Sequence, residues 1–460
     1  MNNGAFELKK KTTIITILLS LVAVTVLGFT VVNVIKNRAN SIEVQTGTEE
    51  SQTETTTKFD YDNLSQILTS SEKIEISAEM LEKANLGEES LKTLETEGQG
   101  GEITSSRFHE ITGYTLNAFT DKFGSEKSKD MGNNGKDSFV LAFTGDINFD
   151  ETSYYVMCHA LEKENKVLDC IDSNFQNVMK SADIMLVNNE FTYSERGTPT
   201  EGKKYTFRAN PEYVHYLTDM GVDIVSLANN HTFDYGYDSF VDTLSTLENA
   251  GIEYVGAGMN SDEANAVKSF IINGYKVGYI ACSGVEYPIH TPVATEDSAG
   301  IMGSYDNGEA VTKAVKSAKK ECDYVIVYPH WGYENTTELS SAQTSNARQW
   351  IDAGADAIIG NHSHCLQGMD FYKGKFIAYS LGNFWFNSKT LPTGILQLTI
   401  SEEGIEPGIV PGIQENRETR MYTSLEDQRK VYDLIESYPA ETGVKIDDNG
   451  KITDAGATLN

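Results

Sequence analysis

Short apolar runs that recur along the middle of the chain constrain its fold more than any other feature. Each run is nearly continuous, as in strands that are covered on both faces. Segments with a helical pattern lie between many of them, at about 211–220, 237–250, 309–320 and 341–353. The alternation predicts an α/β protein in which a mainly parallel sheet, or sheets, is flanked by helices. The runs occupy residues 139–143, 184–187, 223–227, 277–281, 324–328, 357–359 and 376–379.

A polar cluster follows closely after most of these runs. In a parallel sheet the carboxyl ends of the strands lie at one edge, which is where such folds place their sites. The clusters combine carboxylates, amides and imidazoles, so the sequence predicts that they share one site at that edge. In chain order they are Gly145-Asp146, Asn188-Asn189-Glu190, Asn229-Asn230-His231, His330-Trp331-Gly332, Gly360-Asn361-His362-Ser363-His364 and Leu381-Gly382-Asn383.

These residue types are the ones that a hydrolytic metal centre uses. Such a centre needs a bridging carboxylate, further oxygen or nitrogen ligands, and an acid for the leaving group. Mixed oxygen and nitrogen ligands suit one or two divalent ions and do not distinguish among manganese, iron and zinc. Along an extended chain His362 and His364 point in opposite directions, so both reach one site only if the backbone turns there. The candidate ligands are Asp146, Glu190, Asn230, His330, His362 and His364.

Four other side chains have two interpretations each. Asp234 either orients the neighbouring His231 or caps the following helix. Glu334 is either a partner of the nearby histidine ligand or a solvated loop residue. Asn383 either lines the site or forms a turn. Arg208 either meets an anionic substrate or lies on the surface.

The charge balance excludes one class of partner. With 37 Lys and Arg against 67 Asp and Glu, the formal net charge is -30. Nucleic acid requires a basic face on its partner, so binding to nucleic acid is not expected. The same charge disfavours attraction to anionic lipid. The 5 cysteines are too few, and their number is odd, so a disulfide framework is not expected either.

An uncharged apolar segment at residues 12–35 predicts a membrane anchor. At about 1.5 Å per residue a helix of this length is about 36 Å long, enough to cross a hydrocarbon core of about 30 Å. Lysines at 9–11 precede the segment, which favours a cytoplasmic N-terminus at 1–11. We therefore expect a retained, single-pass signal anchor in the cell membrane, with the rest of the chain extracytoplasmic. A cleaved signal is the alternative.

Composition divides the remainder of the chain into three parts. Residues 36–137 are expected to form a polar stalk with a short helical element, because most of this stretch is poor in apolar residues. Residues 138–402 carry the alternation of strands and helices and the predicted site. Residues 403–460 are polar again, with an amphipathic helix at 424–437 and a hairpin at 445–453. We expect this C-terminal extension to lie outside the catalytic core.

Several motifs together carry a family resemblance that covers about 138–400. They are Ser226-Leu227-Ala228-Asn229-Asn230-His231, Asp234-Tyr235-Gly236, Gly256-Ala257-Gly258, His330-Trp331-Gly332-Tyr333-Glu334, Ile359-Gly360-Asn361-His362-Ser363-His364 with Gln367-Gly368, and Tyr379-Ser380-Leu381-Gly382-Asn383-Phe384. This set resembles the CapA family of capsule-synthesis proteins, which is linked to poly-gamma-glutamate production and is similar to the calcineurin-like metallophosphatases. The resemblance implies a four-layer α/β/β/α sandwich with two central sheets.

The resemblance also implies a role for each matching residue. Glu190 stands where the phosphatases place a bridging aspartate, and His231 matches the histidine that protonates the leaving group. The other matching positions are metal ligands: Asp146, Asn230, His330, His362 and His364. Two positions depart from the pattern. Asn148 replaces the histidine of the first motif, which implies a weakened second metal position or a single ion, and Asn361 replaces a usual histidine.

The sequence thus favours a membrane-anchored, metal-dependent hydrolase in capsule or exopolymer synthesis. Its substrate would be a phosphorylated compound or an anionic polymer such as poly-gamma-glutamate, and capsule synthase subunits would be its partners. The alternative is a non-catalytic subunit that binds or exports the polymer within a membrane synthase complex. The missing histidine at Asn148 supports this alternative, whereas the survival of the other ligands favours the hydrolase.

Overall fold

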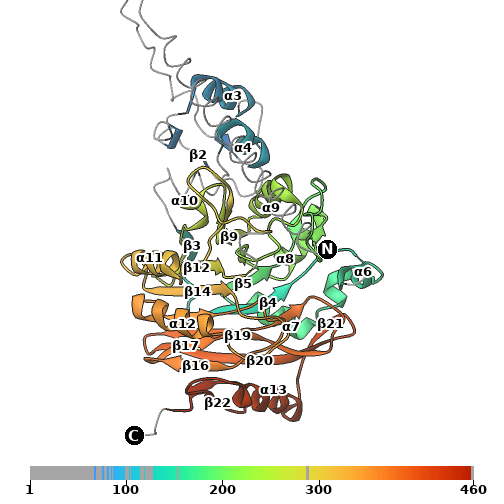
Figure 1. The fold of residues 1–460 in the computed structure, drawn as a ribbon, viewed down its shortest axis with the longest axis vertical. Coiled ribbons are helices and arrows are strands. Elements are labelled where there is room, and N and C mark those ends of the chain that lie inside the picture. Colours follow the sequence, from blue (N-terminus) through green and yellow to red (C-terminus); the bar gives the residue numbers. More distant parts are fainter. Residues whose placement is uncertain are drawn as a thin grey trace, which may run out of the picture. The chain divides into compact units, whose positions relative to one another are not determined.

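The computed structural model describes residues 128–152, 155–285 and 290–456, which form the main body in Figure 1. N-terminal to these it describes only short pieces, at 67–68, 75–76, 80–81, 84, 86–98, 103, 105–113 and 119. Among all these residues, no helix has the length and apolar character needed to cross a membrane. The expected cytoplasmic segment at 1–11 and the expected anchor at 12–35 lie outside the described residues.

Two mixed sheets form the centre of the fold (Figure 1). In the eight-stranded sheet, β4, β5, β8 and β9 run parallel to one another. Strands β19, β20 and β21 extend this sheet in the antiparallel sense, and β18 pairs with β4. The strands are β4 (Ser138–Ile147), β5 (Ile184–Asn189), β8 (Ile224–Ser226), β9 (Glu253–Val255), β18 (Asn383–Trp385), β19 (Leu391–Ser401), β20 (Gly404–Glu415) and β21 (Glu418–Met421).

The seven-stranded sheet has a similar plan. Its central strands β12, β14, β15 and β17 are parallel, and β11 and β16 pair antiparallel with their neighbours. Every strand predicted from the apolar runs overlaps a strand of one of the two sheets. The seven strands are β3 (Lys129–Gly132), β11 (Lys268–Ile272), β12 (Tyr275–Ser283), β14 (Tyr324–His330), β15 (Ala357–Ile359), β16 (Met369–Tyr372) and β17 (Lys375–Ala378).

Three apolar cores hold the layers together. The core between the sheets includes Phe143, Tyr279 and Tyr328, and the rings of Phe143 and Tyr328 stack with their centroids 6.3 Å apart. A second core packs α7 (Ser173–Ser181), α8 (Val214–Asp219) and α9 (Gly236–Asn249) on the outer face of the eight-stranded sheet. A third packs α11 (Glu309–Ala318) and α12 (Ser341–Ala353) on the outer face of the seven-stranded sheet. The predicted α/β class is therefore correct, with the central strands covered on both faces.

An aspartate precedes several parallel strands and bonds the main chain of the neighbouring strand. The Asp223 carboxylate accepts a hydrogen bond from Met185 N at 2.8 Å, and Asp183 accepts one from Val140 N at 2.8 Å. In the other sheet Asp356 accepts one from Val325 N at 2.9 Å. These bonds satisfy amide groups at the amino ends of the strands, opposite the edge that carries the polar clusters.

The predicted helix boundaries follow from capping side chains. Asn210 accepts a hydrogen bond from Glu212 N at the start of the predicted helix at 211–220, which is a 3-10 turn followed by α8. At the start of α12 the Ser340 hydroxyl and the Gln343 side chain form a capping box. Gly354 ends that helix with φ 123°, a conformation that favours glycine.

The structure corrects both boundaries expected for the catalytic domain. On the N-terminal side, β3 lies within the expected stalk at 36–137, yet it pairs in parallel with β11. On the C-terminal side, β20 and β21 lie within the expected extension at 403–460, yet they are strands of the eight-stranded sheet. The expected helix and hairpin are present as α13 (Leu425–Ser437) and β22 (Val444–Ile446) with β23 (Ile452–Asp454). Side chains of all three elements join the core between the sheets. The C-terminal segment is therefore an integral part of the fold, although its polar composition predicted an extension outside it.

Two helices lie in the described part of the expected stalk, α3 (Glu88–Gly98) and α4 (Ser105–Thr112). They share a small apolar cluster that includes Leu91, Leu94 and Phe108.

Candidate metal centre

The ends of strands from both sheets converge on one buried cluster. Asp146 lies near the end of β4, and Glu190 directly follows β5. His330 is the last residue of β14 in the other sheet. The loops after β8 and β15 supply the remaining members. All six predicted ligands come together here: Asp146, Glu190, Asn230, His330, His362 and His364.

One oxygen of each carboxylate accepts a hydrogen bond from Asn188, and the other oxygen has no well-aligned donor. Asn188 Nδ2 donates to Asp146 Oδ1 at 2.8 Å and to Glu190 Oε2 at 3.2 Å. The Asn188 amide is itself oriented, because its Oδ1 accepts a hydrogen bond from Asn229 at 3.1 Å. Asp146 Oδ2 and Glu190 Oε1 are buried, and neither accepts a well-aligned hydrogen bond from a described residue. Burial of such oxygens is costly unless a positive charge compensates it, so they fit a cation.

One set of donor atoms surrounds Glu190 and two histidines. The donor atoms of Glu190, His330 and His362 lie within 4.8 Å of one another. His330 Nε2 lies 3.8 Å from Glu190 Oε1, 3.0 Å from His362 Nδ1 and 2.8 Å from Asn230 Oδ1. Two imidazole nitrogens, a carboxylate oxygen and an amide oxygen thus face one another, a set of donors that suits a divalent transition metal.

A second set of donor atoms shares Glu190 with the first. The donor atoms of Asp146, Glu190 and His364 also lie within 4.8 Å of one another. His364 Nδ1 lies 3.3 Å from Asp146 Oδ2 and 2.8 Å from Asn383 Oδ1. A carboxylate common to two adjoining sets of ligands is the arrangement that a bridging ligand requires. Asn383 therefore lines the site and holds His364, which decides between its two interpretations.

The backbone makes the turn that the two neighbouring histidines require. His362 has φ 93° and His364 has φ 55°, both in the left-handed region. Such conformations cost about 1–3 kcal/mol for a non-glycine residue and concentrate at functional sites. The turn brings the two imidazole rings to a centroid distance of 6.0 Å.

Glycines beside the ligands allow main chains to approach closely. Asp146 N donates to Gly382 O at 2.8 Å, and a Cβ atom on Gly145 would lie 1.7 Å from that same oxygen. At Gly360, which precedes the histidine turn, a Cβ atom would lie 2.1 Å from Tyr379 O. Any side chain at Gly145 or Gly360 would therefore displace a ligand-bearing segment.

Asn361, one of the two departures from the family pattern, orients a ligand. Its Oδ1 accepts a hydrogen bond from His330 Nδ1, as assigned from the surrounding hydrogen-bond network. The lone pair of His330 Nε2 then faces Glu190, Asn230 and His362. Ligating histidines commonly donate their other ring N–H to an oxygen acceptor in this way.

Asp234 orients His231 and does not cap the following helix. Its Oδ2 lies 2.6 Å from His231 Nδ1 and accepts a hydrogen bond from Phe207 N at 2.6 Å. The residue at the N-cap position of α9 is Tyr235, which makes no side-chain capping bond. With Nδ1 bound to Asp234, the other ring nitrogen of His231 lies 3.8 Å from Glu190 Oε1. His231 thus borders the cluster with Nε2 directed towards it.

Burial governs the ionisation of the cluster. Burial, and next the charge of Asp146, raise the pKa of Glu190 well above its ordinary value. Burial and the neighbouring imidazoles hold the pKa of His330 and of His362 well below the usual value. Both histidines are therefore neutral at physiological pH, and neutral imidazole is the form that binds metal. For His364, burial lowers the pKa, but the hydrogen bond and charge of Asp146 raise it above the ordinary value. The donor types and the two neutral imidazoles thus fit a divalent cation, whose charge would favour ionised Glu190.

Three predicted residues lie outside the ligand set. Asn148 Oδ1 accepts a hydrogen bond from Asp150 N at 2.7 Å, so this oxygen is already engaged. The Arg208 guanidinium lies over the ring of Tyr235, 4.2 Å from its centroid, which favours a packing role over substrate binding. Glu334 is exposed and makes no hydrogen bond or ion pair with a described residue, as a solvated loop residue would. Glu334 influences the site through its charge, which contributes to the raised pKa of Glu190.

Sequence reasoning missed several residues that shape the site. Asn188 was part of a recognised cluster, but nothing in the sequence indicated that its amide would link the two carboxylates. Phe207 stacks on the ring of His231 with the centroids 4.1 Å apart. Lys203 forms a buried ion pair with Asp234 at 2.8 Å. These last two lie in a segment without strand or helix periodicity, so no pattern distinguished them.

The fold and the cluster together define a class: an α/β protein with buried histidines and carboxylates placed to hold a divalent metal at its strand ends. Within that class, the family model for the bacterial capsule synthesis protein PGA_cap matches residues 140–388. This is more than half of the chain, and the chain therefore belongs to that family. The family predicted from the motifs is confirmed.

Two curated proteins show the degree of relatedness. The PGA biosynthesis protein CapA of Bacillus subtilis (strain 168) is 30% identical over 279 residues, which cover 58% of this chain and 69% of that protein. The capsule biosynthesis protein CapA of Bacillus anthracis is 32% identical over 239 residues, which cover 50% of this chain and 57% of that protein. The match thus spans little more than half of the second relative.

Solved structures show weaker similarity. A hypothetical protein from Thermus thermophilus has a TM-score of 0.37 at 16% identity, covering 60% of this chain and 100% of that chain. The NAD nucleotidase of Haemophilus influenzae has a TM-score of 0.36 at 13% identity, covering 66% and 64%. Similarity of this degree carries no conclusion about this chain.

Proposed function

We propose that this protein is a metal-dependent hydrolase of the metallophosphatase type that acts in the synthesis of a poly-gamma-glutamate capsule. One observation carries the proposal: Asp146 Oδ2 and Glu190 Oε1 are buried without a well-aligned donor, among imidazoles placed at the distances of metal ligands. A packed core would not retain such a cluster for stability alone, since unpaired buried carboxylates are destabilising. The names of the relatives supply the capsule pathway.

The residues of the cluster would have two roles, metal binding and proton donation. Asp146, Glu190, Asn230, His330, His362 and His364 would hold one or two divalent ions, with Glu190 as the bridging ligand. Such an ion would supply Lewis-acid polarisation of a phosphoryl or carbonyl oxygen and a nucleophile from water. His231 would protonate the leaving group through Nε2, because its Nδ1 is bound to Asp234. A phosphoester or the amide bond of poly-gamma-glutamate would fit this division.

A second candidate function is a non-catalytic subunit that binds or exports the polymer. Asn148 favours it, because an amide that already accepts a hydrogen bond from Asp150 N stands where the phosphatases have a histidine ligand. The first set, around His330, is complete in either case. The two functions therefore differ in turnover and agree on metal binding.

The deciding experiment combines metal analysis with two hydrolysis assays. The purified protein, reloaded with Mn²⁺, Fe²⁺ or Zn²⁺, is assayed with a phosphodiester and with poly-gamma-glutamate. Hydrolysis that a chelator abolishes and that His231→Ala greatly reduces supports the hydrolase. His215→Ala is the control, because His215 is exposed on α8. Metal binding without turnover of either substrate supports the binding subunit.

We also propose that the protein is anchored in the cell membrane by residues 12–35, with the rest extracytoplasmic. The support is the length of this uncharged segment and the lysines that precede it. Protease added to intact cells should degrade residues 36–460 while leaving cytoplasmic markers intact. Deleting residues 12–35 should release the protein from the membrane fraction. Full protection from protease in intact cells would contradict the proposed topology.

A further inference from the structure

A buried lysine lies directly behind His231 and Asp234. The side chain of Lys203 is 4% exposed, and that of its partner Asp234 is fully buried. Lys203 Nζ lies 2.8 Å from Asp234 Oδ1 and also donates to the main-chain oxygen of Asn230. Burying an ammonium group costs several kcal/mol, on the order of the penalty for any desolvated ion, unless it is paired and hydrogen-bonded. Lys203 meets both conditions at the turn that carries the site.

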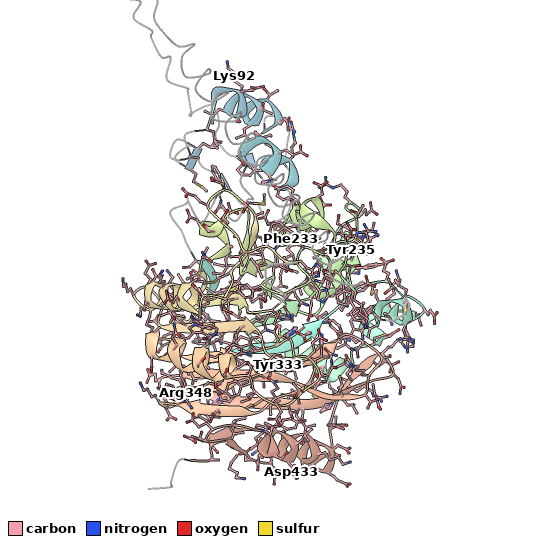
Figure 2. All side chains as sticks on the ribbon, viewed as in Figure 1. Lys92, Phe233, Tyr235, Tyr333, Arg348 and Asp433 are labelled. Atoms are coloured by element: carbon pink, nitrogen blue, oxygen red, sulfur yellow. The ribbon has the colours of Figure 1, made fainter. Side chains whose placement is uncertain are left out.

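The segment that contains Lys203 is fitted closely to the turn around Asp234, which Phe233 and Tyr235 mark in Figure 2. Thr200 N donates to Asp234 O at 2.8 Å. Phe207, at the other end of the segment, donates its N–H to the Asp234 carboxylate and stacks on His231. Every polar atom of the Asp234 side chain therefore contacts either this segment or His231.

The two oxygens of the Asp234 carboxylate contact different partners. Oδ1 faces the Lys203 ammonium, and Oδ2 faces His231 Nδ1 at 2.6 Å. With Oδ1 held by the lysine, the carboxylate plane is fixed and Oδ2 remains available to the imidazole. Lys203 Nζ also donates a hydrogen bond to the main-chain oxygen of Asn230. The ammonium group therefore contacts both Asp234 and a predicted metal ligand. Thr291 Oγ1 donates to that Asn230 oxygen as well, at 2.7 Å.

We propose that Lys203 is a positioning residue that acts through Asp234 to hold His231 as the proton donor to the leaving group. This inference rests on the proposed hydrolase function. When the bond between phosphorus and the leaving oxygen breaks, the electron pair stays on that oxygen, which takes the Nε2 proton of His231. Water forms the new bond to phosphorus and releases its proton to solvent. Lys203 does not touch the substrate in this step.

Leaving-group dependence tests the proposal, because a proton donor matters most when the leaving group is basic. For a 4-nitrophenyl phosphodiester, kcat of Lys203→Met should fall little. For the corresponding unsubstituted phenyl ester, kcat should fall by about tenfold more, a part of the 10²–10⁴-fold that proton transfer contributes. Lys203→Arg should recover part of the loss. The matched control is Lys204→Met, since Lys204 is exposed and adjacent, and it should leave both rates unchanged.

Two controls separate positioning from a general loss of structure. The metal content of Lys203→Met should match that of the wild type, and the variant should be fully folded at the assay temperature. Its thermal unfolding midpoint should fall, because Asp234 is left buried without its ionic partner. If the methionine variant does not fold, Lys203→Gln, which keeps a hydrogen-bond donor, replaces it. Equal losses of kcat for the two esters, or no loss, would overturn the proposal.

A second measurement does not depend on turnover. In NMR spectra of the full chain, the His231 Nδ1–H proton should give a slowly exchanging signal, identified by its absence from His231→Gln. We expect this signal to be lost or shifted in Lys203→Met and retained in Lys204→Met. If the wild type hydrolyses neither ester and does not hydrolyse poly-gamma-glutamate, the hydrolase function fails, and the NMR result alone decides whether Lys203 positions His231. An unchanged signal in Lys203→Met would overturn the positioning role.

Discussion

At the scale of single residues, the site depends on oriented amides as much as on its ligands. Asn188 binds one oxygen of each carboxylate, Asn361 binds His330, and Asn383 binds His364. Asn188 leaves the second oxygen of each carboxylate without a well-aligned donor, and Asn361 leaves His330 Nε2 facing Glu190 and Asn230. The chain therefore fixes the ligand geometry before any ion enters, which lowers the cost of assembling the centre.

Removing one of these amides should weaken metal binding without unfolding the protein. In Asn361→Ala, His330 Nδ1 loses its acceptor and the ring is free to rotate. We expect metal affinity to fall by about 10–100-fold, the usual effect of losing a residue that orients a ligand. Competition with a chromophoric chelator measures the change. Asn177→Ala, at an exposed position on α7, is the control and should bind metal as the wild type does. Equal affinity in the two variants would contradict the role of Asn361.

At the scale of elements, close contact between β4 and the segment before β18 places the first carboxylate. The Asp146 N–H bonds Gly382 O, and only a glycine at 145 permits that approach. Gly382 itself has φ 61°, in the left-handed region. The geometry of this contact, more than any side chain, sets the distance between Asp146 and His364.

Gly145→Ala should therefore destabilise the fold and disturb the site together. The new Cβ atom would lie 1.7 Å from Gly382 O, so the two segments must separate. We expect the free energy of unfolding to fall by about 1–3 kcal/mol or more, as for other overpacked positions. Urea unfolding measures the loss. Gly408→Ala is the control, because its nearest contact would be an ordinary 3.5 Å. Equal stability of the two variants would contradict the account of this contact.

The aspartates at the amino ends of the strands make a prediction about pH. Burial raises the pKa of Asp223 to about 6, and the charge of Asp183 adds to this rise. The hydrogen bond from Met185 and the charge of Lys129 lower the pKa, but they do not outweigh burial. The folded protein holds this proton up to a higher pH than the unfolded chain does. Stability from this group is therefore fully present below about pH 4 and is lost as the pH rises through about 6.

Asp223→Asn should remove this pH dependence. The free energy of unfolding of the variant minus that of the wild type should rise by about 3 kcal/mol from pH 4 to pH 7. This figure follows because each unit of pKa shift corresponds to about 1.4 kcal/mol. Urea unfolding at several pH values measures the difference. Asp433→Asn, on the surface of α13 (Figure 2), should show no such trend. A constant offset between Asp223→Asn and the wild type would contradict the prediction.

The central elements could be predicted because their sequence signals are local. Continuous apolar runs marked β4, β5, β12 and β14, and polar clusters marked the region near the ends of β4, β5 and β14. Strands β3 and β20 escaped prediction because they lie at or near the sheet edges, where polar and apolar residues mix. For the site, residue types and order were enough to find the ligands. The contacts of Lys203 and Asn188 could not be predicted, because they depend on segments that only the folded chain brings together.

At the scale of the whole molecule, the described part of the chain from β3 to β23 forms one folded unit. Strand β20 pairs along its whole length with β19, and α13 packs its buried Val431, Tyr432 and Ile435 into the core between the sheets. The family model ends at residue 388. The segments after it nevertheless complete the sheet that carries Asp146 and Glu190.

A chain that ends at residue 402 should not fold stably. It would lose β20, β21 and α13, exposing the edge of β19 and the apolar side chains that α13 covers. We expect it to aggregate or to melt without a cooperative transition, as measured by calorimetry. A chain that ends at residue 456 keeps every described element and should melt as the full chain does. Cooperative unfolding of the shorter chain would contradict an integral role for these segments.

The central claim is that the cluster at the strand ends is a metal centre, and anomalous diffraction tests it most directly. Crystals grown with Mn²⁺ and measured on both sides of the manganese edge should show a peak in contact with Glu190, Asn230, His330 and His362. A second, weaker peak beside Asp146 and His364 would indicate that Glu190 bridges two ions. His330→Ala should abolish the first peak, whereas His215→Ala should retain it. A well-ordered cluster with no anomalous peak in the presence of excess Mn²⁺, Fe²⁺ and Zn²⁺ would contradict the claim.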